Sequence, residues 1–401
     1  MKILFISTLA SLRLVDEIHN ITGGNPGYAV QKFCRLIVKG LNANGIETRS
    51  LSNPPITRKE NSKYWVKLGR EEENGLTYIY VPFINLPVLK HICVFLFTFF
   101  FVLVWGVRER RDKAIICDVL SISNCLGALL ASKLNRLRSV ALVTDIYSQM
   151  VGEETIGFRA MVCKTAGAMQ KWYSTSFTHY VLLTEAMNEI VNPRKRPYIV
   201  MEALCDSAIQ FEHEFSIEKD LPATVLYAGG VEQQYGLKTL VEAFQSIKRD
   251  DVRLIIYGHG SYVEDIKRVS NEDKRIEYRG IVPNEVIIDA ERKATLLVNP
   301  RFTNEVYTKY SFPSKNMEYM VSGTPVLTTI LPGMPQEYYP YVFLFDKGET
   351  VEGYSEVLRS VLSLSPEILT KRGKMAREFV LKKKNNLVQT NRIVELITVE
   401  R

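Results

Sequence analysis

Short apolar runs alternate with helical patterns along the first half of the chain. Lys2–Ser7 predicts a buried first strand, and a polar loop that passes through residues 23–27 follows it. Four apolar residues then recur at helical spacing and predict a helix: Val30, Phe33, Ile37 and Leu41. Further strand-like runs lie at 77–81, 114–117, 140–143 and 180–183. The alternation predicts a doubly wound α/β domain with a parallel sheet over residues 1–207.

The same alternation restarts in the second half. An apolar run that leads into glycines at 224–230 precedes an amphipathic helical pattern at 237–247. Later strand-like runs lie at 253–257, 276–278, 294–298, 324–327 and 342–345. Residues 208–222 are polar and without clear period, so they predict a linker. The pattern therefore predicts a second α/β domain over 223–380, and the carboxyl ends of both sheets are expected to line a central cleft.

One segment breaks this pattern. Residues 92–107 carry no charge and are flanked by Lys90 on one side and by Arg108, Arg110 and Arg111 on the other. As a helix, such a run spans about 24 Å, which is short of the roughly 30 Å hydrocarbon core of a bilayer. A buried crossover helix and an apolar face that dips into a membrane interface beside cationic anchors both remain open, and a spanning helix is less favoured.

Composition and charge narrow the class of protein. The 401 residues are 46% hydrophobic and 24% charged, which excludes disordered and low-complexity classes and predicts two domains. Residues 1–200 hold 25 lysines and arginines against 15 acidic residues, whereas 201–401 hold 26 against 29. No basic block with interleaved aromatics is present, so we expect no nucleic-acid binding. A basic first half is compatible with an anionic partner such as lipid head groups.

Cysteine and motif usage exclude several chemistries. The six cysteines form no CxxC pair and no Cys/His cluster at metal spacing, so they predict reduced thiols in a cytoplasmic protein and no zinc site. The apolar run at the N-terminus is too short to predict a signal peptide. The sequence contains no Walker loop, HExxH or nucleophile elbow, which argues against NTPases, metalloproteases and serine hydrolases.

The richest chemistry lies at residues 299–326. A strand is expected to end near 299, and a helix then begins at Pro313 or Ser314 with Lys315 in its first turn. A helix N-terminus with a hydroxyl and a cation is suited to bind phosphate. Glu318, one turn further on, can accept hydrogen bonds from sugar hydroxyls. The alternative is an ordinary capped helix with a solvated lysine and glutamate.

The chain resembles the GT-B glycosyltransferases of family GT4. The resemblance rests on the order of several segments: Gly23-Gly24, residues 227–244, residues 255–260, residues 278–280, and Glu318 followed by residues 322–325. It implies two Rossmann-like domains that face a central cleft, retaining sugar transfer from a nucleotide diphosphate sugar, and no metal or other cofactor. It also implies that a C-terminal helix over 381–401 packs back on the first domain.

The departures from the family pattern lie at the expected donor site. The family commonly has two glutamates seven residues apart; Glu318 falls on the second, and Tyr310 falls on the first. Many members also carry an arginine and a lysine on the donor phosphates, and those places hold Gly230 and Tyr235 here. We expect Lys315 with Ser314, and after them Arg301, to take over the diphosphate charge.

The remaining donor-site candidates follow from the same resemblance. They are the glycine turn Gly229-Gly230, the segment Tyr310, Phe312, Pro313, and Val282 beside the base. The Phe-Pro-Ser-Lys version of the motif resembles a subset found among bacterial surface-polysaccharide transferases.

The first domain offers fewer candidates. Asp145 follows a predicted strand, next to Thr144 at the place of a family histidine, and would act on the acceptor hydroxyl as a base or position it. Its alternative role is to cap the next helix. Asp118 is interpreted as a strand-end turn or cap. Gly23 and Gly24 would either allow a tight turn or let the backbone approach donor phosphate or acceptor.

The resemblance thus implies a metal-independent, retaining glycosyltransferase. Its acceptor would be a glycan or a polyprenyl-diphosphate-linked glycan in capsule, exopolysaccharide or O-antigen synthesis, with the enzyme peripheral on the inner face of the cytoplasmic membrane. A nucleotide-sugar epimerase of the same fold and a non-catalytic GT-B partner protein are the alternatives.

Overall fold

The computed structural model describes the chain except residues 24–26, 110–111, 147–157, 210–218 and 399–401. The described residues form two compact units. Unit 1 comprises Met1–Leu204 together with Asn386–Arg401, and unit 2 comprises Cys205–Asn385. The chain thus crosses between the units twice. The predicted linker over 208–222 differs from this division, because Lys219 already donates hydrogen bonds to the carbonyls of Arg292 and Ala294 in unit 2.

Unit 1 is built on an eight-stranded sheet in the order β10-β9-β8-β7-β1-β2-β5-β4, in which only β4 runs antiparallel to its neighbour. Its strands are β1 (Lys2–Ser7), β2 (Glu47–Ser52), β4 (Arg70–Glu73), β5 (Leu76–Tyr80), β7 (Lys113–Asp118), β8 (Arg138–Val143), β9 (His179–Leu182) and β10 (Tyr198–Val200). Strands β3 (Trp65–Val66) and β6 (Phe83–Ile84) form a separate antiparallel pair.

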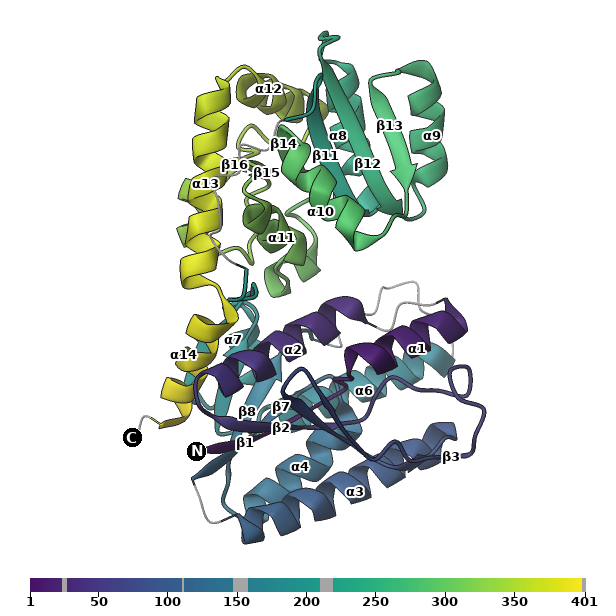
Figure 1. Ribbon diagram of the computed structural model, residues 1–401, viewed down its shortest axis with the longest axis vertical. Helices are drawn as coiled ribbons and strands as arrows, with labels where there is room; N and C mark the ends of the chain where they lie inside the picture. The colour runs from purple at the N-terminus through teal and green to yellow at the C-terminus, as the bar shows by residue number, and fades with distance from the viewer. Residues whose placement is uncertain (24–26, 110–111, 147–157, 210–218, 399–401) are drawn as a thin grey trace. The chain divides into compact units, whose positions relative to one another are not determined.

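Helices cover both faces of this sheet, with α1 and α2 on one side and α3 and α4 on the other (Figure 1). The helices of unit 1 are α1 (Leu12–Thr22), α2 (Tyr28–Ala43), α3 (Pro87–Arg108), α4 (Ile122–Leu134), α6 (Phe158–Ser174), α7 (Met187–Val191) and α14 (Asn386–Thr398). The central strands are buried on both faces, which explains why they appear in the sequence as continuous apolar runs.

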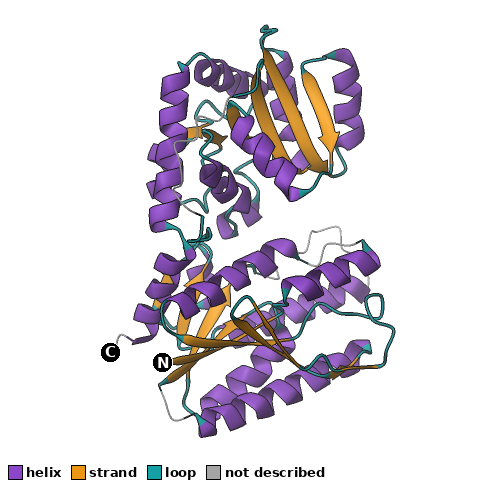
Figure 2. Ribbon diagram, in the orientation of Figure 1, coloured by secondary structure: helices purple, strands orange, loops and turns teal. Residues whose placement is uncertain are grey.

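Unit 2 is built on a six-stranded, all-parallel sheet in the order β13-β12-β11-β14-β15-β16, flanked by helices (Figure 2). Its strands are β11 (Ala223–Gly230), β12 (Val252–His259), β13 (Ile276–Gly280), β14 (Leu296–Asn299), β15 (Val326–Thr328) and β16 (Phe343–Leu344). Its helices are α8 (Leu237–Gln245), α9 (Val263–Glu272), α10 (Asn284–Lys293), α11 (Ser314–Ser322), α12 (Val351–Leu362) and α13 (Pro366–Lys383), with 3-10 turns η1 (Gln233–Tyr235), η2 (Val306–Tyr310) and η3 (Gln336–Tyr341).

Alternate residues of β11 serve the two faces of this sheet. Val225 and Tyr227 join the core formed with α8, α9 and α12. On β11 the backbone N–H of Ala228 donates a 2.8 Å hydrogen bond to the Tyr319 hydroxyl, which ties α11 to the sheet. The two parallel sheets with helical layers confirm the predicted α/β class.

The predicted loop after β1 is wrong over its first half, because residues 12–22 form helix α1. Leu14, Val15 and Ile18 are buried on one side of that helix, and the Ser11 hydroxyl caps its N-terminus by accepting from the N–H of Leu14. The spacing of Leu14, Val15 and Ile18 is that of an amphipathic helix, so the sequence contains the signal and the loop prediction overlooked it.

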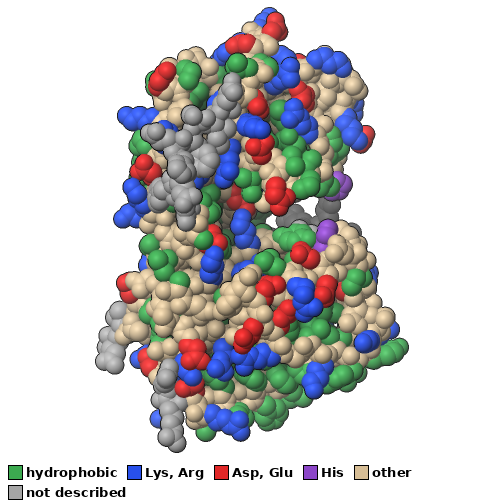
Figure 3. Space-filling view, viewed as in Figure 1, with side chains coloured by type: hydrophobic (Ala, Val, Ile, Leu, Met, Phe, Trp, Pro, Cys, Tyr) green, Lys and Arg blue, Asp and Glu red, His purple; other side chains and the backbone are tan. Residues whose placement is uncertain are grey.

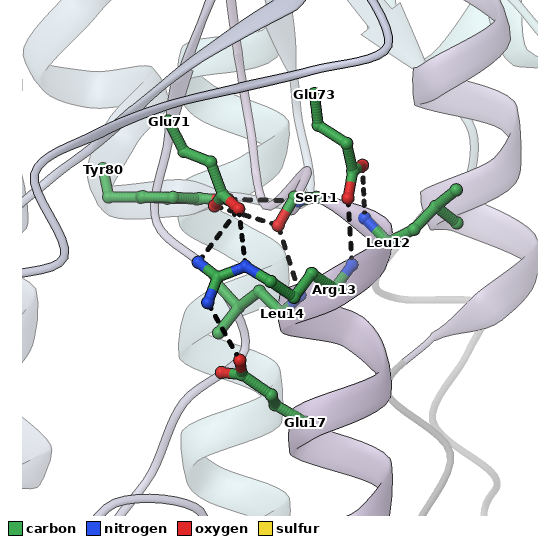
Figure 4. Close-up of polar contacts among 8 residues, drawn as sticks. All are labelled: Ser11, Leu12, Arg13, Leu14, Glu17, Glu71, Glu73 and Tyr80. Atoms are coloured by element: carbon green, nitrogen blue, oxygen red, sulfur yellow. Dashed lines mark hydrogen bonds and ion pairs between the residues drawn. The ribbon is translucent and has the colours of Figure 1, made fainter.

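Two carboxylates of the edge strand β4 hold the start of α1 (Figure 4). Glu73 accepts hydrogen bonds from the backbone N–H groups of Leu12 and Arg13, at 2.7 and 3.1 Å. Glu71 accepts from the Ser11 and Tyr80 hydroxyls at 2.9 and 3.0 Å, and from the Arg13 guanidinium at 3.0 Å. The negative charges lie at the positive end of the helix dipole, where they stabilise it.

The helix expected over 381–401 is divided in two. Helix α13 ends at Lys383, and α14 begins at Asn386 as part of unit 1. There it packs on α2, where a Cβ on Gly40 would lie 2.4 Å from the Asn386 carbonyl oxygen. Asn44 adds a hydrogen bond of 2.9 Å from its side-chain amide to the Leu387 carbonyl.

Candidate functional site

The polar cluster of unit 2 lies where β11 and β14 end and α11 begins. β11 and β14 are neighbouring parallel strands, so their carboxyl ends lie at the same edge of the sheet. Buried amides fix α11 relative to β14, since Asn299 Nδ2 donates to Asn316 Oδ1 at 2.8 Å. The ends of β11 and β14 and the start of α11 therefore lie around one point of unit 2.

Lys315, in the first turn of α11, extends toward the end of β11. Its ammonium donates a 2.8 Å hydrogen bond to the Tyr227 hydroxyl, which in turn donates to the Gly230 carbonyl at 2.6 Å. A Cβ on Gly229 would lie only 1.6 Å from the Lys315 Nζ. Glycine at this position, with φ +152°, is thus what admits the lysine.

The ammonium of Lys315 is held in an environment that disfavours its charge. Burial, and after it the positive charge of Arg301, lower the pKa of Lys315 to about 7, and Glu318 acts in the opposite direction. An anion that bound beside this nitrogen would favour the charged form. The solvated lysine considered from the sequence is therefore excluded.

Arg301, just after β14, forms the second cationic group. Its guanidinium carbon lies 4.7 Å from the ring centre of Tyr307 and 5.2 Å from that of Tyr235. The Nε of Arg301 is buried and has no hydrogen-bond partner among the described residues, and the same holds for the Tyr307 hydroxyl and the Ser311 Oγ. Three unsatisfied polar atoms from one short segment are unusual, and a polar ligand would satisfy them.

Tyr235 lies at the position where the resemblance expects a phosphate-binding lysine. The structure puts the Arg301 guanidinium over that tyrosine ring, so a cation from the end of β14 approaches the place of the missing one. Neither this pairing nor the roles of Tyr307 and Ser311 could be derived from the sequence, since no local pattern links residues this far apart along the chain.

The other predicted donor residues surround this cluster. Phe312 is buried and packs on the Tyr338 ring, with ring centres 5.2 Å apart, and so acts in packing. Pro313 is the N-cap residue of α11, Ser314 and Glu318 are exposed on that helix, and Tyr310 ends η2 half-buried. Val282 lies beyond the end of the edge strand β13, and its contact with a base stays a prediction.

In unit 1 the predicted residues are less closely grouped. Gly23 has φ +63° and ends α1, where its N–H donates to the His19 carbonyl at 2.7 Å, so it acts as a helix C-cap. Gly24 lies outside the described residues. Asp145 follows β8 half-buried, and its backbone carbonyl accepts from the Gln170 side chain at 3.3 Å.

A cavity of about 390 Å³ lies at the carboxyl ends of β1 and β7. It is lined by Thr8, Ile18, Thr22, Gly27, Val30, Gln31, Pro55, Glu60, Asp118 and Leu120. Asp118 is its most deeply buried acid, at 1% exposure. Burial raises the pKa of Asp118 to about 6, against a hydrogen bond from the Leu120 N–H, and the charge of Asp145 adds to the increase. The sequence pattern predicts only a turn or cap role for Asp118.

The described residues contain no group of three or more His, Cys, Asp or Glu side chains that could hold a metal ion. The cationic cluster of unit 2 is instead suited to an anion, since Lys315 and Arg301 supply donors without an acidic pair between them. The arrangement can bind phosphate oxygens and stabilise negative charge on them.

Comparison with known proteins agrees with this architecture. Residues 222–363 match the family model "Glycosyl transferases group 1". No curated protein matches the sequence as a relative.

Solved structures are similar over nearly the whole chain. The sucrose-phosphate synthase of Thermosynechococcus elongatus has a TM-score of 0.64 at 15% identity, with 98% of both chains covered. The lipopolysaccharide outer core galactosyltransferase WaaB has a TM-score of 0.61 at 17% identity, and Anabaena HepE in complex with UDP-glucose has 0.62 at 14%. Both cover 99% of each chain. The chain therefore has the GT-B fold, and its residues 222–363 are similar to the glycosyl transferases group 1.

Proposed function

We propose that the chain transfers a sugar, with retention at the anomeric carbon, from a nucleotide diphosphate sugar to a hydroxyl of a glycan or lipid-linked glycan acceptor. The observation that carries this proposal is the cluster of Lys315 and Arg301 beside the glycine turn of β11, with unsatisfied polar atoms around it. Anabaena HepE, which is similar in fold, forms a complex with UDP-glucose, and this supports a nucleotide-sugar donor.

In this proposal the diphosphate lies against Lys315 and Arg301. When the bond between the anomeric carbon and the diphosphate oxygen breaks, negative charge grows on the leaving group, and two cations fixed by the fold stabilise it without rearrangement. Glu318, exposed one turn further along α11, accepts hydrogen bonds from donor hydroxyls. The proposed steps use no metal ion.

The acceptor is assigned to unit 1. The cavity at the ends of β1 and β7 offers Thr8, Glu60 and Asp118 to a polyhydroxylated ligand. A carboxyl whose pKa is raised to about 6 is suited to accept a hydroxyl proton near neutral pH. Asp118 therefore joins Asp145 as a candidate for the acceptor base.

The test is donor turnover with a panel of nucleotide sugars, by wild type and by the variants Lys315→Ala and Arg301→Ala. Each variant is expected to lower kcat/KM for the donor by at least about 100-fold, the usual effect of removing a group that stabilises transition-state charge. Lys347→Ala, an exposed lysine of the same unit, is the matched control and should be near wild type.

Three results would contradict the proposal. Near wild-type turnover in both site variants would show that the donor binds elsewhere. Conversion of the donor to its epimer without any acceptor would assign the chain to the epimerases, and failure to bind every donor in calorimetry would identify a non-catalytic protein.

A further inference from the structure

Helix α3 contacts the rest of unit 1 along one narrow face. Its buried residues are Val94, Thr98, Val102 and Gly106, which recur every fourth position. They pack on α4, where the Thr98 hydroxyl donates to Asn124 Oδ1 at 2.9 Å. A Cβ on Gly127 of α4 would lie 2.5 Å from the Phe95 carbonyl oxygen, so the two helices are in close contact. This packing fixes α3 on the surface of unit 1.

The other side of α3 is apolar and exposed. We call the exposed residues Val88, Leu89, Ile92, Leu96, Phe100, Val104 and Val107 the apolar stripe. Phe100, near the middle, is 56% exposed. Hydrophobic side chains gather along the lower edge in Figure 3, where Figure 1 draws α3. Leu130 and Leu134 of α4 are also exposed. An exposed apolar surface of this length marks an interaction site.

The length of α3 differs from the sequence expectation. The helix has 22 residues and is about 33 Å long at the usual rise per residue. The mean hydropathy of its most apolar stretch is 2.2, and 17% of that stretch is buried. Within the described residues it is the one helix long and apolar enough to cross a membrane. The polar contact of Thr98 and the close packing on Gly127 argue that it stays on unit 1 instead.

Cations outnumber acids around the stripe, and the acid next to Arg108, Glu109, is paired with Lys2 at 2.7 Å. Neither α3 nor α4 contains an aspartate or glutamate. Arg108 ends α3, and Lys133 and Arg136 are exposed at the end of α4, which lies alongside because the Asn135 amide donates to the Leu103 carbonyl at 2.9 Å. A surface with apolar middle and cationic end is complementary to a bilayer with anionic head groups.

We propose that α3 lies in the interface of a membrane that contains anionic lipids. The apolar stripe enters the upper acyl region, and Arg108, Lys133 and Arg136 contact the head-group phosphates. Beside the stripe a cavity of about 620 Å³, lined by apolar side chains of α3 and by Arg49, Arg108 and Glu109, offers room for part of a lipid chain. This inference does not depend on which reaction the chain catalyses.

The experiment is sedimentation of the full chain with vesicles of phosphatidylcholine alone or with about 30% phosphatidylglycerol, at low salt, where head-group attraction is strongest. Wild type should bind the anionic vesicles, release at high salt, and show a blue shift of tryptophan emission that Trp105→Phe removes. The double variant Leu96→Glu, Phe100→Glu should bind at least about tenfold less, because a charged side chain in the acyl region is costly. The exposed positions let both variants fold, which thermal unfolding checks.

The matched control is Ile368→Glu, Met375→Glu, which adds the same charge at exposed apolar positions of α13 in unit 2 and should bind as wild type does. Wild type that ignores anionic vesicles, or a control that loses binding equally, would overturn the proposal. A third result would also overturn it: wild type that does not bind vesicles but is a dimer in analytical ultracentrifugation, with the α3 variant monomeric. The stripe would then be an interface between two copies of the chain.

Discussion

At the scale of single residues, the ammonium of Lys315 is buried and has fewer hydrogen-bond partners than it can use without a ligand. Its nitrogen has one hydroxyl partner, from Tyr227, and lies near a second cation, Arg301. Such a group is close to the midpoint of its titration at neutral pH in the empty protein. This has a consequence for donor binding.

Donor affinity should therefore decrease as pH rises above 7. The folded, ligand-free pKa of Lys315 is about 7, so at higher pH the lysine is neutral and must take up a proton to bind a diphosphate. The dissociation constant should increase by up to about tenfold per pH unit between about pH 7 and pH 9. Calorimetric titration in buffers of different ionisation enthalpy measures the proton uptake directly. Lys315→Met should abolish this pH dependence; if the variant keeps it, another group is responsible.

Gly229 gives a second prediction at this scale. In Gly229→Ala the new methyl would occupy the site of the Lys315 ammonium, so the flexible lysine is displaced, and the φ of +152° adds backbone strain. We expect donor affinity to decrease by about as much as in Lys315→Ala, and the double variant to be no worse than either single one. Gly348→Ala is the control, since Gly348 also has positive φ but open space around it. Additive losses in the double variant would contradict the contact.

At the scale of elements, the edge strand β4 anchors α1 through its acidic side chains. Burial acts to raise the pKa of Glu71, but hydrogen bonds from Arg13, Ser11 and Tyr80 outweigh it and hold the pKa below the ordinary glutamate value. The carboxylate therefore stabilises the fold in its charged form.

Glu71→Gln should lower the free energy of unfolding by about 1–3 kcal/mol at neutral pH, the range for a hydrogen bond to a charged group. The difference in unfolding free energy between wild type and variant should have its full size above the unfolded glutamate pKa of about 4.3. It should diminish as pH falls through the lower folded pKa, because Glu71 of wild type then becomes protonated and loses its charge as well. Denaturant unfolding of both proteins at several pH values measures this difference. Glu72→Gln is the control on the same strand, exposed and paired with Arg70. An equal difference at about pH 3 and about pH 7 would disprove the role of the charge.

The strands were easier to predict from sequence than the helices. Parallel strands such as β7 and β11 are buried on both faces, so they stand out as apolar runs. Helix α1 was overlooked although Leu14, Val15 and Ile18 have the spacing of an amphipathic helix, because that signal is short and precedes a glycine-rich loop. At the site, Lys315 followed from the local pattern at the start of α11. The position of Arg301 over Tyr235, and the burial of Asp118, depend on segments distant in sequence and could not be predicted from it.

At the scale of the whole molecule, unit 1 is completed by the segment that follows unit 2. Ile393 and Ile397 of α14 are buried in unit 1, and Asn386 donates to the Leu36 carbonyl at 3.2 Å. The stability of the first domain thus depends on a helix that lies beyond the whole of unit 2 in the sequence.

Ile393→Ala should therefore destabilise unit 1, by about 2–5 kcal/mol for a fully buried side chain, and leave unit 2 unchanged. Hydrogen exchange followed by mass spectrometry can distinguish the units: peptides of α2 should lose protection, and peptides of β11 and β12 should keep it. Val388→Ala, on an exposed position of α14, is the control. Equal loss of protection in both units would show that they unfold together.

The interruption of unit 1 by unit 2 also orders events during synthesis. When residues 1–204 have left the ribosome, the face of α2 that α14 covers is still open, and it stays so until residues 386–398 emerge. All strands of unit 2 have emerged by then, so unit 2 can fold before unit 1 is complete. Domains usually fold in the order of the chain. During this interval the surface of α2 around Gly40 lacks its partner helix and is open to aggregation.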